Sequence, residues 1–508
     1  MEYTDEQIKI CDFVKNNINN KDVIIKINAF AGTGKTTTLK MIAEAMPNKN
    51  FLYLAFNKGM ADDLKKNCPN NITVLTIHGF AYKYTRNIIA IDNNLKNHKM
   101  FELAMRYKLE LHVASAAFDL LSRYCNSDAQ DEPNIFLKKL EYVKPFLKTV
   151  AERSKRDIKP HDIISYTQKM WDDMLTADLE PTHDFYLKFF DINVNKYLMA
   201  PAFDGIMLDE AQDSNGVTIS IFNKIKANVR IAVGDEHQQI YAFRDSVNAL
   251  HKIKSDNVFY LTNSFRFGKN IAFRANNILH KFKNEKIDIV GTKQFDNKSK
   301  DADELTKCYI GRTNAGIIRK MIELSENTIP FKTVRDPKLI FSLILNILYY
   351  LYDINTGFNS EKYIKNYNNI NHLISSAEIS DDIELLTAGT LVKKFSNEPE
   401  KLIEIFETAN SYHKSRKKIK TYLSTAHTVK GLEFDIVDIL YDFIPFKNHL
   451  EKADVTEKEY LKNIYKYPLL SQEVNLYYIA VTRAIRECIG FPQSFFMNGY
   501  PKGWSINR

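Results

Sequence analysis

A short turn near the start of the chain combines glycine, lysine and threonine in an order that suits phosphate binding. It reads Ala29-Phe-Ala-Gly-Thr-Gly-Lys-Thr36 and stands between an apolar run and a helical pattern. Gly32 and Gly34 let the backbone bend closely around an anion, while backbone amides and the helix start supply partial positive charge. Lys35 can reach the β- and γ-phosphates of a nucleoside triphosphate, and the Thr36 hydroxyl can face Mg²⁺. The strict pattern begins with glycine where this chain has alanine, but the strand–turn–helix context still predicts a P-loop. The residues expected to line it are Ala31, Gly32, Thr33, Gly34, Lys35, Thr36 and Thr37.

Two acidic residues at the end of a second apolar run would complete such a site. Asp209 and Glu210 directly follow the run 203–208. Asp209 suits Mg²⁺ together with Thr36, and Glu210 suits the orientation and deprotonation of an attacking water. An Asp-Glu pair after a strand is usually a polar strand end or a helix cap, but a P-loop in the same chain favours the catalytic interpretation. The sequence therefore predicts hydrolysis of a nucleoside triphosphate with Mg²⁺, with Lys35 on the phosphates.

The elements that would position these residues fall into two separated blocks. Near-continuous apolar runs that lead into polar turns are typical of parallel strands buried on both faces, so each block predicts an α/β domain. The runs are 23–28, 51–56, 72–76, 203–208, 229–233 and 258–261 in the first block, and 308–310, 422–424, 436–440 and 488–491 in the second. Residues 86–200 and 315–420 show helical spacing instead. Because each of them interrupts a block, each is predicted to be a helical insertion.

The composition limits the class of protein. The 508 residues are 44% hydrophobic and 26% charged, which predicts a folded chain of several domains. The formal charge of +8 permits a polyanionic partner without requiring one. The five cysteines stand apart, which argues against a disulfide framework and against a structural zinc site. The first residues lack the features of a signal peptide, and the longest apolar stretch, Leu339–Tyr352, is too short to cross a bilayer. We expect a soluble intracellular protein, in the cytoplasm of a prokaryote or the nucleus of a eukaryote, with no membrane partner.

Seven further segments, in the same order along the chain, resemble the motifs of superfamily 1 helicases of the UvrD/PcrA-like class. The similarity is greatest to the helicase core of the F-box DNA helicases. The segments are Tyr3–Gln7, Leu54–Ala61, Thr76–Phe80, Gly234–Arg244, Asn263–Gly268, Ser424–Asp435 and Asn475–Ala484. No F-box-like extension precedes residue 1, so we do not expect recruitment to a ubiquitin ligase.

The resemblance implies an α/β fold of two RecA-like parallel-sheet motor domains, each with a mainly helical insertion. It places the first motor domain at 1–85 and 201–264, with its insertion at 86–200. The second motor domain is expected at 265–330 and 421–508, with a small helical insertion at 331–420.

The resemblance also implies contacts to the nucleotide from outside the P-loop. Gln7 is expected to read the edge of adenine and Phe265 to stack on its ring. Gly431 and Glu433 are expected near the ribose or phosphate end.

Three further residues are expected to contact the γ-phosphate. Gln238 would sense it from the first domain. Arg266 and Arg483 would reach it from the second, where an arginine spreads positive charge over the transferring oxygens. A salt bridge is the ordinary role of such an arginine, but its position within a motif favours the phosphate.

Two aromatic residues after the predicted sensor are candidates for contact with DNA. Tyr241 and Phe243 can stack on successive bases, which contributes about 1–3 kcal/mol per base. In a chain with 32 Phe and 27 Tyr most aromatic residues belong to the core, but the position of this pair near Gln238 favours DNA. The other predicted DNA contacts are Asn57, His78, Phe80, Arg244 and His427.

Together these features predict an ATP-dependent DNA helicase or translocase that moves 3′→5′ on single-stranded DNA, with single-stranded DNA and single-strand/duplex junctions as partners. Two alternatives stay open. One is a translocase that strips proteins from DNA, and the other is an ATPase subunit of a larger repair or defence complex that also has a protein partner.

Overall fold

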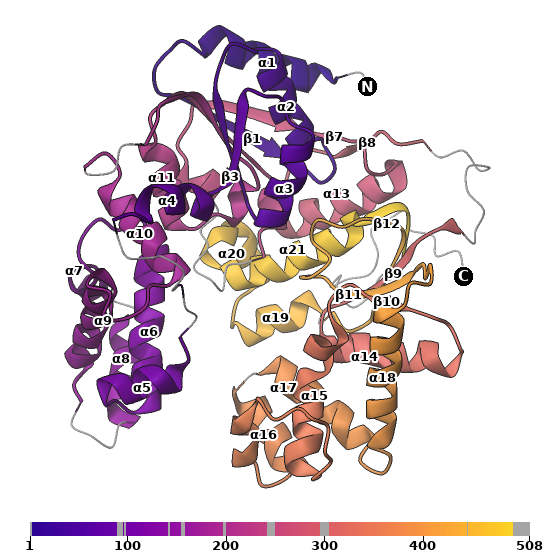
Figure 1. The fold of residues 1–508 in the computed structure, drawn as a ribbon. Helices are drawn as coiled ribbons and strands as arrows, with labels where there is room; N and C mark the ends of the chain where they lie inside the picture. The colour runs from indigo at the N-terminus through magenta and orange to yellow at the C-terminus, as the bar shows by residue number, and fades with distance from the viewer. Residues whose placement is uncertain are drawn as a thin grey trace. The chain divides into compact units, whose positions relative to one another are not determined.

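The computed structural model describes residues 3–88, 95, 98–140, 143–153, 158–196, 200–240, 249–294, 304–380, 382–443 and 445–490. The chain divides into two compact units, Met1–Leu261 and Thr262–Arg508 (Figure 1). Each unit contains a parallel sheet flanked by helices. The predicted fold class, α/β with two RecA-like parallel-sheet domains, is thereby confirmed. The finer division into four segments stays a prediction.

The sheet of the first unit has the strand order β3-β2-β4-β5-β1-β6, and every pairing is parallel. Its strands are β1 (Val23–Ala29), β2 (Phe51–Ala55), β3 (Ile72–Thr76), β4 (Phe203–Leu208), β5 (Ala227–Gly234) and β6 (Asn257–Leu261). Only β5 separates β1 from β4, so the turns that follow these two strands emerge close together at one edge of the sheet.

Two hydrophobic cores cover the two faces of this sheet. Phe51 and Tyr53 enter one core, while Leu52 and Leu54 enter the other, as expected for a strand buried on both faces. The first core is closed by α1 (Asp5–Asn17), α2 (Lys35–Glu44) and α3 (Lys58–Lys66).

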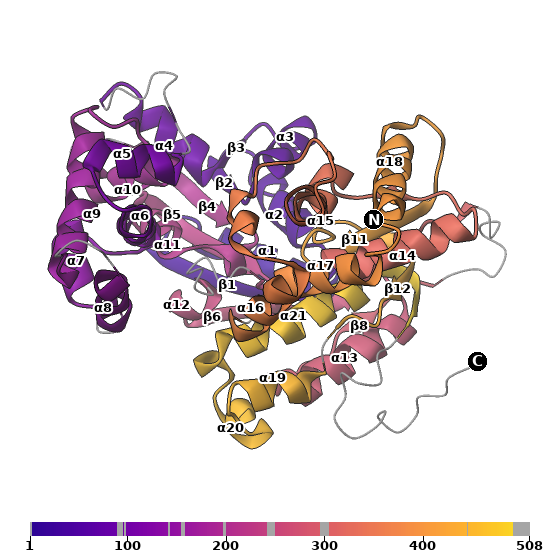
Figure 2. The ribbon, with the colours of Figure 1, turned by 90° about the horizontal axis from the view of Figure 1, so that it is seen from below.

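The second core of this unit continues from the sheet into the helices within residues 86–200 without a break. Those helices are α5 (Met100–Tyr107), α6 (Leu111–Asn126), α7 (Pro133–Lys138), α8 (Val143–Arg153), α9 (Pro160–Leu175) and α10 (His183–Asn193). The same core includes α4 (Ile77–Thr85), which precedes them, and α11 (Gly216–Lys224) and α12 (Ala249–Lys252), which follow β4. Figures 1 and 2 both show α5 to α10 gathered beside one another.

The second unit has a smaller parallel sheet with the order β10-β11-β9-β12-β13, and a separate pair, β7 with β8. Its strands are β7 (Asn263–Ser264), β8 (Val290–Gly291), β9 (Lys307–Gly311), β10 (Lys332–Thr333), β11 (Thr421–Thr425), β12 (Phe434–Ile439) and β13 (Ala484–Ile489). Its helices are α13 (Lys269–Lys283), α14 (Asn314–Glu326), α15 (Pro337–Leu351), α16 (Ile370–Ser380), α17 (Ile383–Lys394), α18 (Glu400–Lys414), α19 (Phe446–Lys452), α20 (Glu457–Lys462) and α21 (Pro468–Thr482). The helices α15 to α18 lie between β10 and β11 in the chain and share a core with α14.

Among the described residues, no helix combines the length and the apolar character needed to cross a membrane.

Candidate functional site

The turn after β1 has the backbone shape of a phosphate cradle. Gly32 and Gly34 have φ angles of +75° and +79°, a left-handed region that favours glycine. The Thr33 hydroxyl donates to the carbonyl of Phe30 at 2.9 Å and fixes the turn from inside. The helix α2 begins immediately afterwards at Lys35, so the amino end of a helix faces the space that the turn encloses.

The acidic pair after β4 reaches this turn. The Thr36 hydroxyl donates to Asp209 Oδ2 at 3.2 Å, and Lys35 Nζ lies 3.7 Å from Glu210 Oε1. Glu210 itself has a left-handed backbone with φ +50°, which costs about 1 kcal/mol or more in a non-glycine residue. The structure thus brings together two pairs of residues, Lys35–Thr36 and Asp209–Glu210, that stand far apart in the sequence and that were predicted to act as one site.

These oxygens match what a bound Mg²⁺ requires. Magnesium prefers hard oxygen ligands and usually takes one or two from the protein, and Thr36 and Asp209 offer a hydroxyl and a carboxylate side by side. Burial and the neighbouring charge of Glu210 raise the pKa of Asp209, whereas a hydrogen bond from Tyr53 and the charge of Lys35 oppose the rise. A bound divalent cation stabilises the charged form of such a buried carboxylate, because the cation compensates for the hydration that the carboxylate loses on burial.

Tyr53 belongs to this site although sequence reasoning missed it. Its hydroxyl donates to Asp209 Oδ2 from the middle of β2. Burial, followed by the charge of Asp209, raises the pKa of Tyr53 well above its ordinary value, so the hydroxyl stays a donor. In the sequence, Tyr53 is one of several apolar residues in a predicted strand, and no local pattern indicates that its hydroxyl contacts Asp209.

Gln7 and Gln238 are both buried near the P-loop and the acidic pair. Gln7 accepts from the amide of Thr4 at the start of α1 and donates to the Thr38 hydroxyl at 3.0 Å. It therefore ties the first helix to α2, and its predicted contact with adenine stays a prediction. Gln238 follows β5 and donates to Asp235 Oδ2 at 2.6 Å.

The predicted nucleotide contacts of the second unit gather at the amino ends of β12 and β13. Arg266 Nε donates to Glu433 Oε2 at 2.9 Å, and its Nη1 donates to the carbonyl of Thr482 at 3.1 Å. Arg483 is 1% exposed and donates to the carbonyls of Ile479 and Leu432. Two predicted γ-phosphate contacts thus lie near each other, and one of them is paired with Glu433.

Two other predicted residues flank this group. Gly431 has a φ of +88°, a conformation that favours glycine. The side chain of Phe265 is partly exposed, as a residue that stacks on a base must be.

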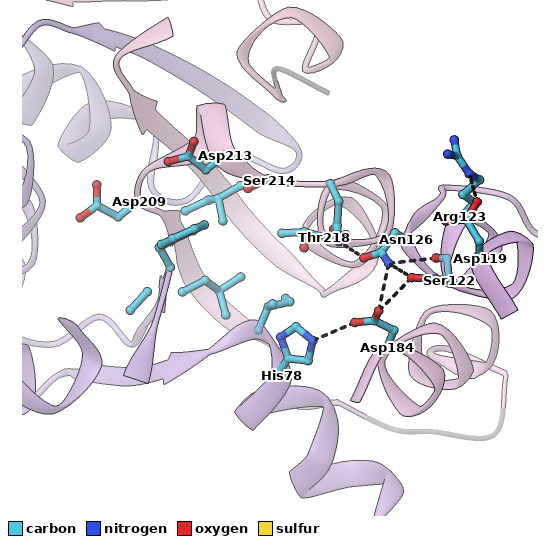
Figure 3. A pocket seen from close by; sticks show the side chains of 16 residues that line it. His78, Asp119, Ser122, Arg123, Asn126, Asp184, Asp209, Asp213, Ser214 and Thr218 are labelled. Atoms are coloured by element: carbon cyan, nitrogen blue, oxygen red, sulfur yellow. Dashed lines mark hydrogen bonds and ion pairs between the residues drawn. The ribbon is translucent and has the colours of Figure 1, made fainter. Parts of the chain in front are cut away.

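A cavity of about 680 Å³ adjoins Asp209 on the side of the inserted helices (Figure 3). Figure 3 shows Asp209 and Asp213 at one end and Asp119 and Arg123 at the other. Phe56, which follows β2 and is 42% exposed, also lines it. This exposed aromatic side chain was missed, although it lies within the segment 54–61 that resembles a DNA-contacting motif.

The predicted DNA contacts of the first unit have different surroundings. Asn57 caps α3 by accepting from the amide of Met60. His78 lines the cavity, with its Nε2 4.0 Å from Asp184 Oδ1. Phe80 is 1% exposed and packs against Phe190, so its predicted contact with DNA is wrong for this structure, because a base cannot reach a core ring. The predicted contacts Tyr241, Phe243 and Arg244 lie outside the described residues.

His427 is the second residue of the segment between β11 and β12, which ends with Glu433. Burial, followed by the charge of Arg312, lowers the pKa of His427 to about 4, so the imidazole is neutral at pH 7. Arg312 forms a two-point pair with Glu473, with N–O distances of 2.8 and 2.7 Å. Sequence reasoning missed this pair, because the two residues are 161 positions apart.

Comparisons with known proteins agree with this architecture. Residues 13–257 match the family model of the UvrD/REP helicase N-terminal domain. The F-box DNA helicase 1 of Gallus gallus is 28% identical over 502 residues, covering 93% of this chain and 47% of the relative. The F-box DNA helicase protein 1 of Schizosaccharomyces pombe is 26% identical, covering 92% of this chain and 56% of the relative. A probable DNA helicase II homolog of Mycoplasma pneumoniae is 24% identical over 294 residues, covering 49% of this chain and 39% of the relative. This chain spans about half the length of the two F-box relatives. The family match in the first unit and the relatives along nearly the whole chain support the resemblance of this chain to UvrD-like helicases of superfamily 1.

Proposed function

We propose that this chain is an ATP-dependent DNA helicase or translocase that moves 3′→5′ on single-stranded DNA. The observation that carries the proposal is the group formed by Lys35, Thr36, Asp209 and Glu210 at one edge of the first sheet. The direction of movement and the DNA substrate rest on the resemblance to UvrD-like helicases.

The residues of the first unit divide the work of ATP hydrolysis among them. Thr36 and Asp209 would hold Mg²⁺, which when bound neutralises charge on the phosphate oxygens. Lys35 and the amides after Gly32 would bind the β- and γ-phosphates. Glu210 would orient a water for in-line attack and accept its proton.

The residues of the second unit would complete the transition state. Arg266 would spread positive charge over the transferring oxygens, an effect of about 10³–10⁵ in rate for arginines of this type. Arg483, which is buried in this structure, would do the same only after its side chain leaves the carbonyls of Ile479 and Leu432. Arg266 itself is mostly buried at 16% exposed, but its partner Glu433 is half exposed. The Glu433 carboxylate can therefore be hydrated when Arg266 turns to a phosphate.

We propose that single-stranded DNA is the second ligand. Phe56 offers an aromatic face at the cavity, and stacking on aromatic rings binds bases without sequence preference. Tyr241, Phe243 and His427 are the further contacts expected from the motifs.

ATP hydrolysis measured without nucleic acid and with single-stranded DNA, duplex DNA or RNA tests this proposal. We expect strong stimulation by single-stranded DNA in the wild type and no hydrolysis in Lys35→Ala. Glu210→Gln should still bind ATP. Hydrolysis by Lys35→Ala at the wild-type rate would refute the site, and equal rates with all nucleic acids would refute the DNA substrate.

Strand displacement separates the alternatives. A helicase opens a duplex that has a 3′ single-stranded tail, whereas a stripping translocase displaces a bound protein from single-stranded DNA and opens duplex poorly. An ATPase that works only within a larger complex would show neither activity by itself.

A further inference from the structure

The side chain of Gln212 bridges two parts of the site that the proposed mechanism treats separately. Its Nε2 donates to Glu210 Oε2 at 2.6 Å, and its Oε1 accepts from the backbone amide of Asp235 at 3.1 Å. Asp235 in turn accepts from Gln238 at 2.6 Å. A continuous series of hydrogen bonds therefore runs from the residue that would activate water to the residue that would sense the γ-phosphate.

The orientation of this bridge is determined by its partners. The Asp235 amide can only donate, so it must meet the oxygen of the Gln212 side chain, and the nitrogen of that side chain must then face Glu210. Glu210 is held on its other oxygen by Lys35, so both oxygens of the carboxylate are positioned. Gln212 is fully buried, and its bridge is therefore shielded from competing water.

The absence of a side chain at Gly234 leaves the space that the Gln212 side chain occupies. A Cβ atom at Gly234 would stand 2.2 Å from Gln212 Oε1 and 3.1 Å from the amide nitrogen of Ala211. Only glycine at the end of β5 allows the Gln212 side chain to reach the next amide.

We propose that Gln212 is a positioning residue that couples the turn carrying Gln238 to the orientation of the Glu210 carboxylate. When the Asp235–Gln238 turn moves, its hydrogen bond to Gln212 displaces the Gln212 side chain. This displacement reorients the Glu210 carboxylate or breaks its hydrogen bond to Gln212. ATP hydrolysis is thereby made to depend on the state of the turn. The role of Gln212 in turnover rests on the proposed ATPase function, whereas the mechanical link can be measured without nucleotide.

Hydrogen–deuterium exchange of the nucleotide-free full chain tests the link directly. In Gln212→Leu the Asp235 amide loses its acceptor, and we expect its exchange to accelerate about tenfold, the effect of one ordinary hydrogen bond. Glu210→Leu should also accelerate that exchange, although Glu210 does not contact the amide, because the Gln212 Nε2 then keeps only its longer hydrogen bond to Asp213 Oδ2 at 3.3 Å. Glu210→Gln, which can still accept, should not. Unchanged exchange in Gln212→Leu or in Glu210→Leu overturns the proposal.

Kinetics test the function of the link. Gln212→Leu should lower the DNA-stimulated kcat about 10–100-fold, as loss of a partner of a catalytic group does, with KM for ATP changed less than about threefold.

The outcomes separate this inference from the proposed function. If the wild type shows no DNA-stimulated hydrolysis, the proposed function fails, and with it the role of Gln212 in turnover. If the wild type is active and Gln212→Leu keeps its kcat, only the inference fails. Thermal unfolding of Gln212→Leu near the wild-type temperature excludes a general loss of folding as the cause of a lower rate.

Discussion

The stability of the second unit should depend strongly on the ion pair between Arg312 and Glu473, and this dependence can be measured. Both side chains are mostly buried, at 23% and 13% exposed, and two hydrogen bonds of 2.8 and 2.7 Å join them. Glu473→Gln keeps the shape of the side chain but removes the charge that compensates Arg312. Breaking a buried pair by removing one partner costs about 3–5 kcal/mol. A change of 1 kcal/mol shifts Tm by about 2–4 °C in a unit of this size, so the expected fall is about 6–20 °C.

The assay is thermal unfolding at pH 7, with a double-mutant cycle that adds Arg312→Met. Removing both charges should restore part of the lost stability, because no uncompensated charge then remains. Glu451→Gln is the matched control, since its pair with Lys447 on the same unit is about 60% exposed and should contribute less than about 1 kcal/mol. A fall of less than about 2 °C in Glu473→Gln, or no recovery in the double variant, would refute the importance of the pair.

The same pair predicts how stability depends on pH. Burial acts to raise the pKa of Glu473, but the hydrogen bonds and charge of Arg312 outweigh it and lower the pKa. The contribution of Glu473 is therefore complete above the unfolded value of about 4.3 and is lost as the pH falls through the folded pKa. Glu473→Gln should remove this part of the acid sensitivity.

Four further predictions concern the site. Asp209→Asn should abolish hydrolysis yet stabilise the nucleotide-free chain, because the raised pKa of Asp209 means that its charge is disfavoured in the folded state. The gain in Tm should grow as the pH rises above about 3.9, the ordinary pKa of an aspartate. A loss of Tm that does not depend on pH would contradict this prediction. Arg266→Ala should lower DNA-stimulated kcat much more than ATP affinity, as single-turnover rates and nucleotide titration can show, whereas equal losses would indicate a ground-state contact. His427→Gln should leave the slope of log Kd for DNA against log salt unchanged at pH 7, because a neutral imidazole releases no counterion, and a shallower slope would mean that the histidine is charged. Replacing Tyr241 and Phe243 together by Ala should lower the number of base pairs opened per ATP consumed, and an unchanged ratio would assign both rings to the core.

The parallel strands were predictable from sequence because burial on both faces leaves an apolar run in the chain. The run 72–76 coincides with β3 and 203–208 with β4, and the other predicted runs differ from the observed strands by a few residues at their ends. The two-residue strands β7, β8 and β10 were not predicted, since so short a strand leaves no periodic pattern.

The site was predictable where a local pattern carries the chemistry, as in the P-loop and the Asp209–Glu210 pair. It was not predictable where a side chain acts through a partner that is distant in the chain. Tyr53 has its role only because β2 pairs with β4, the strand that Asp209 follows. Gln212 has its role only because β4 pairs with β5, the strand that Asp235 follows. Phe80 was misassigned for the same reason, because its burial depends on the distant helix α10.

The hydrophobic core that the sheet shares with the inserted helices limits how this chain can evolve and be engineered. Leu54 and Leu208, which directly precede Ala55 and Asp209, belong to the same core as Leu120 and Phe190 of the insertion. An insertion joined only by linkers could be excised or exchanged between relatives as a cassette. Excision of residues 86–200 would instead expose the part of this core that α4, α11 and α12 do not cover, and such an apolar surface favours aggregation. Chimeras should therefore fold only when the insertion is transferred together with the apolar residues of β2 and β4 that face it.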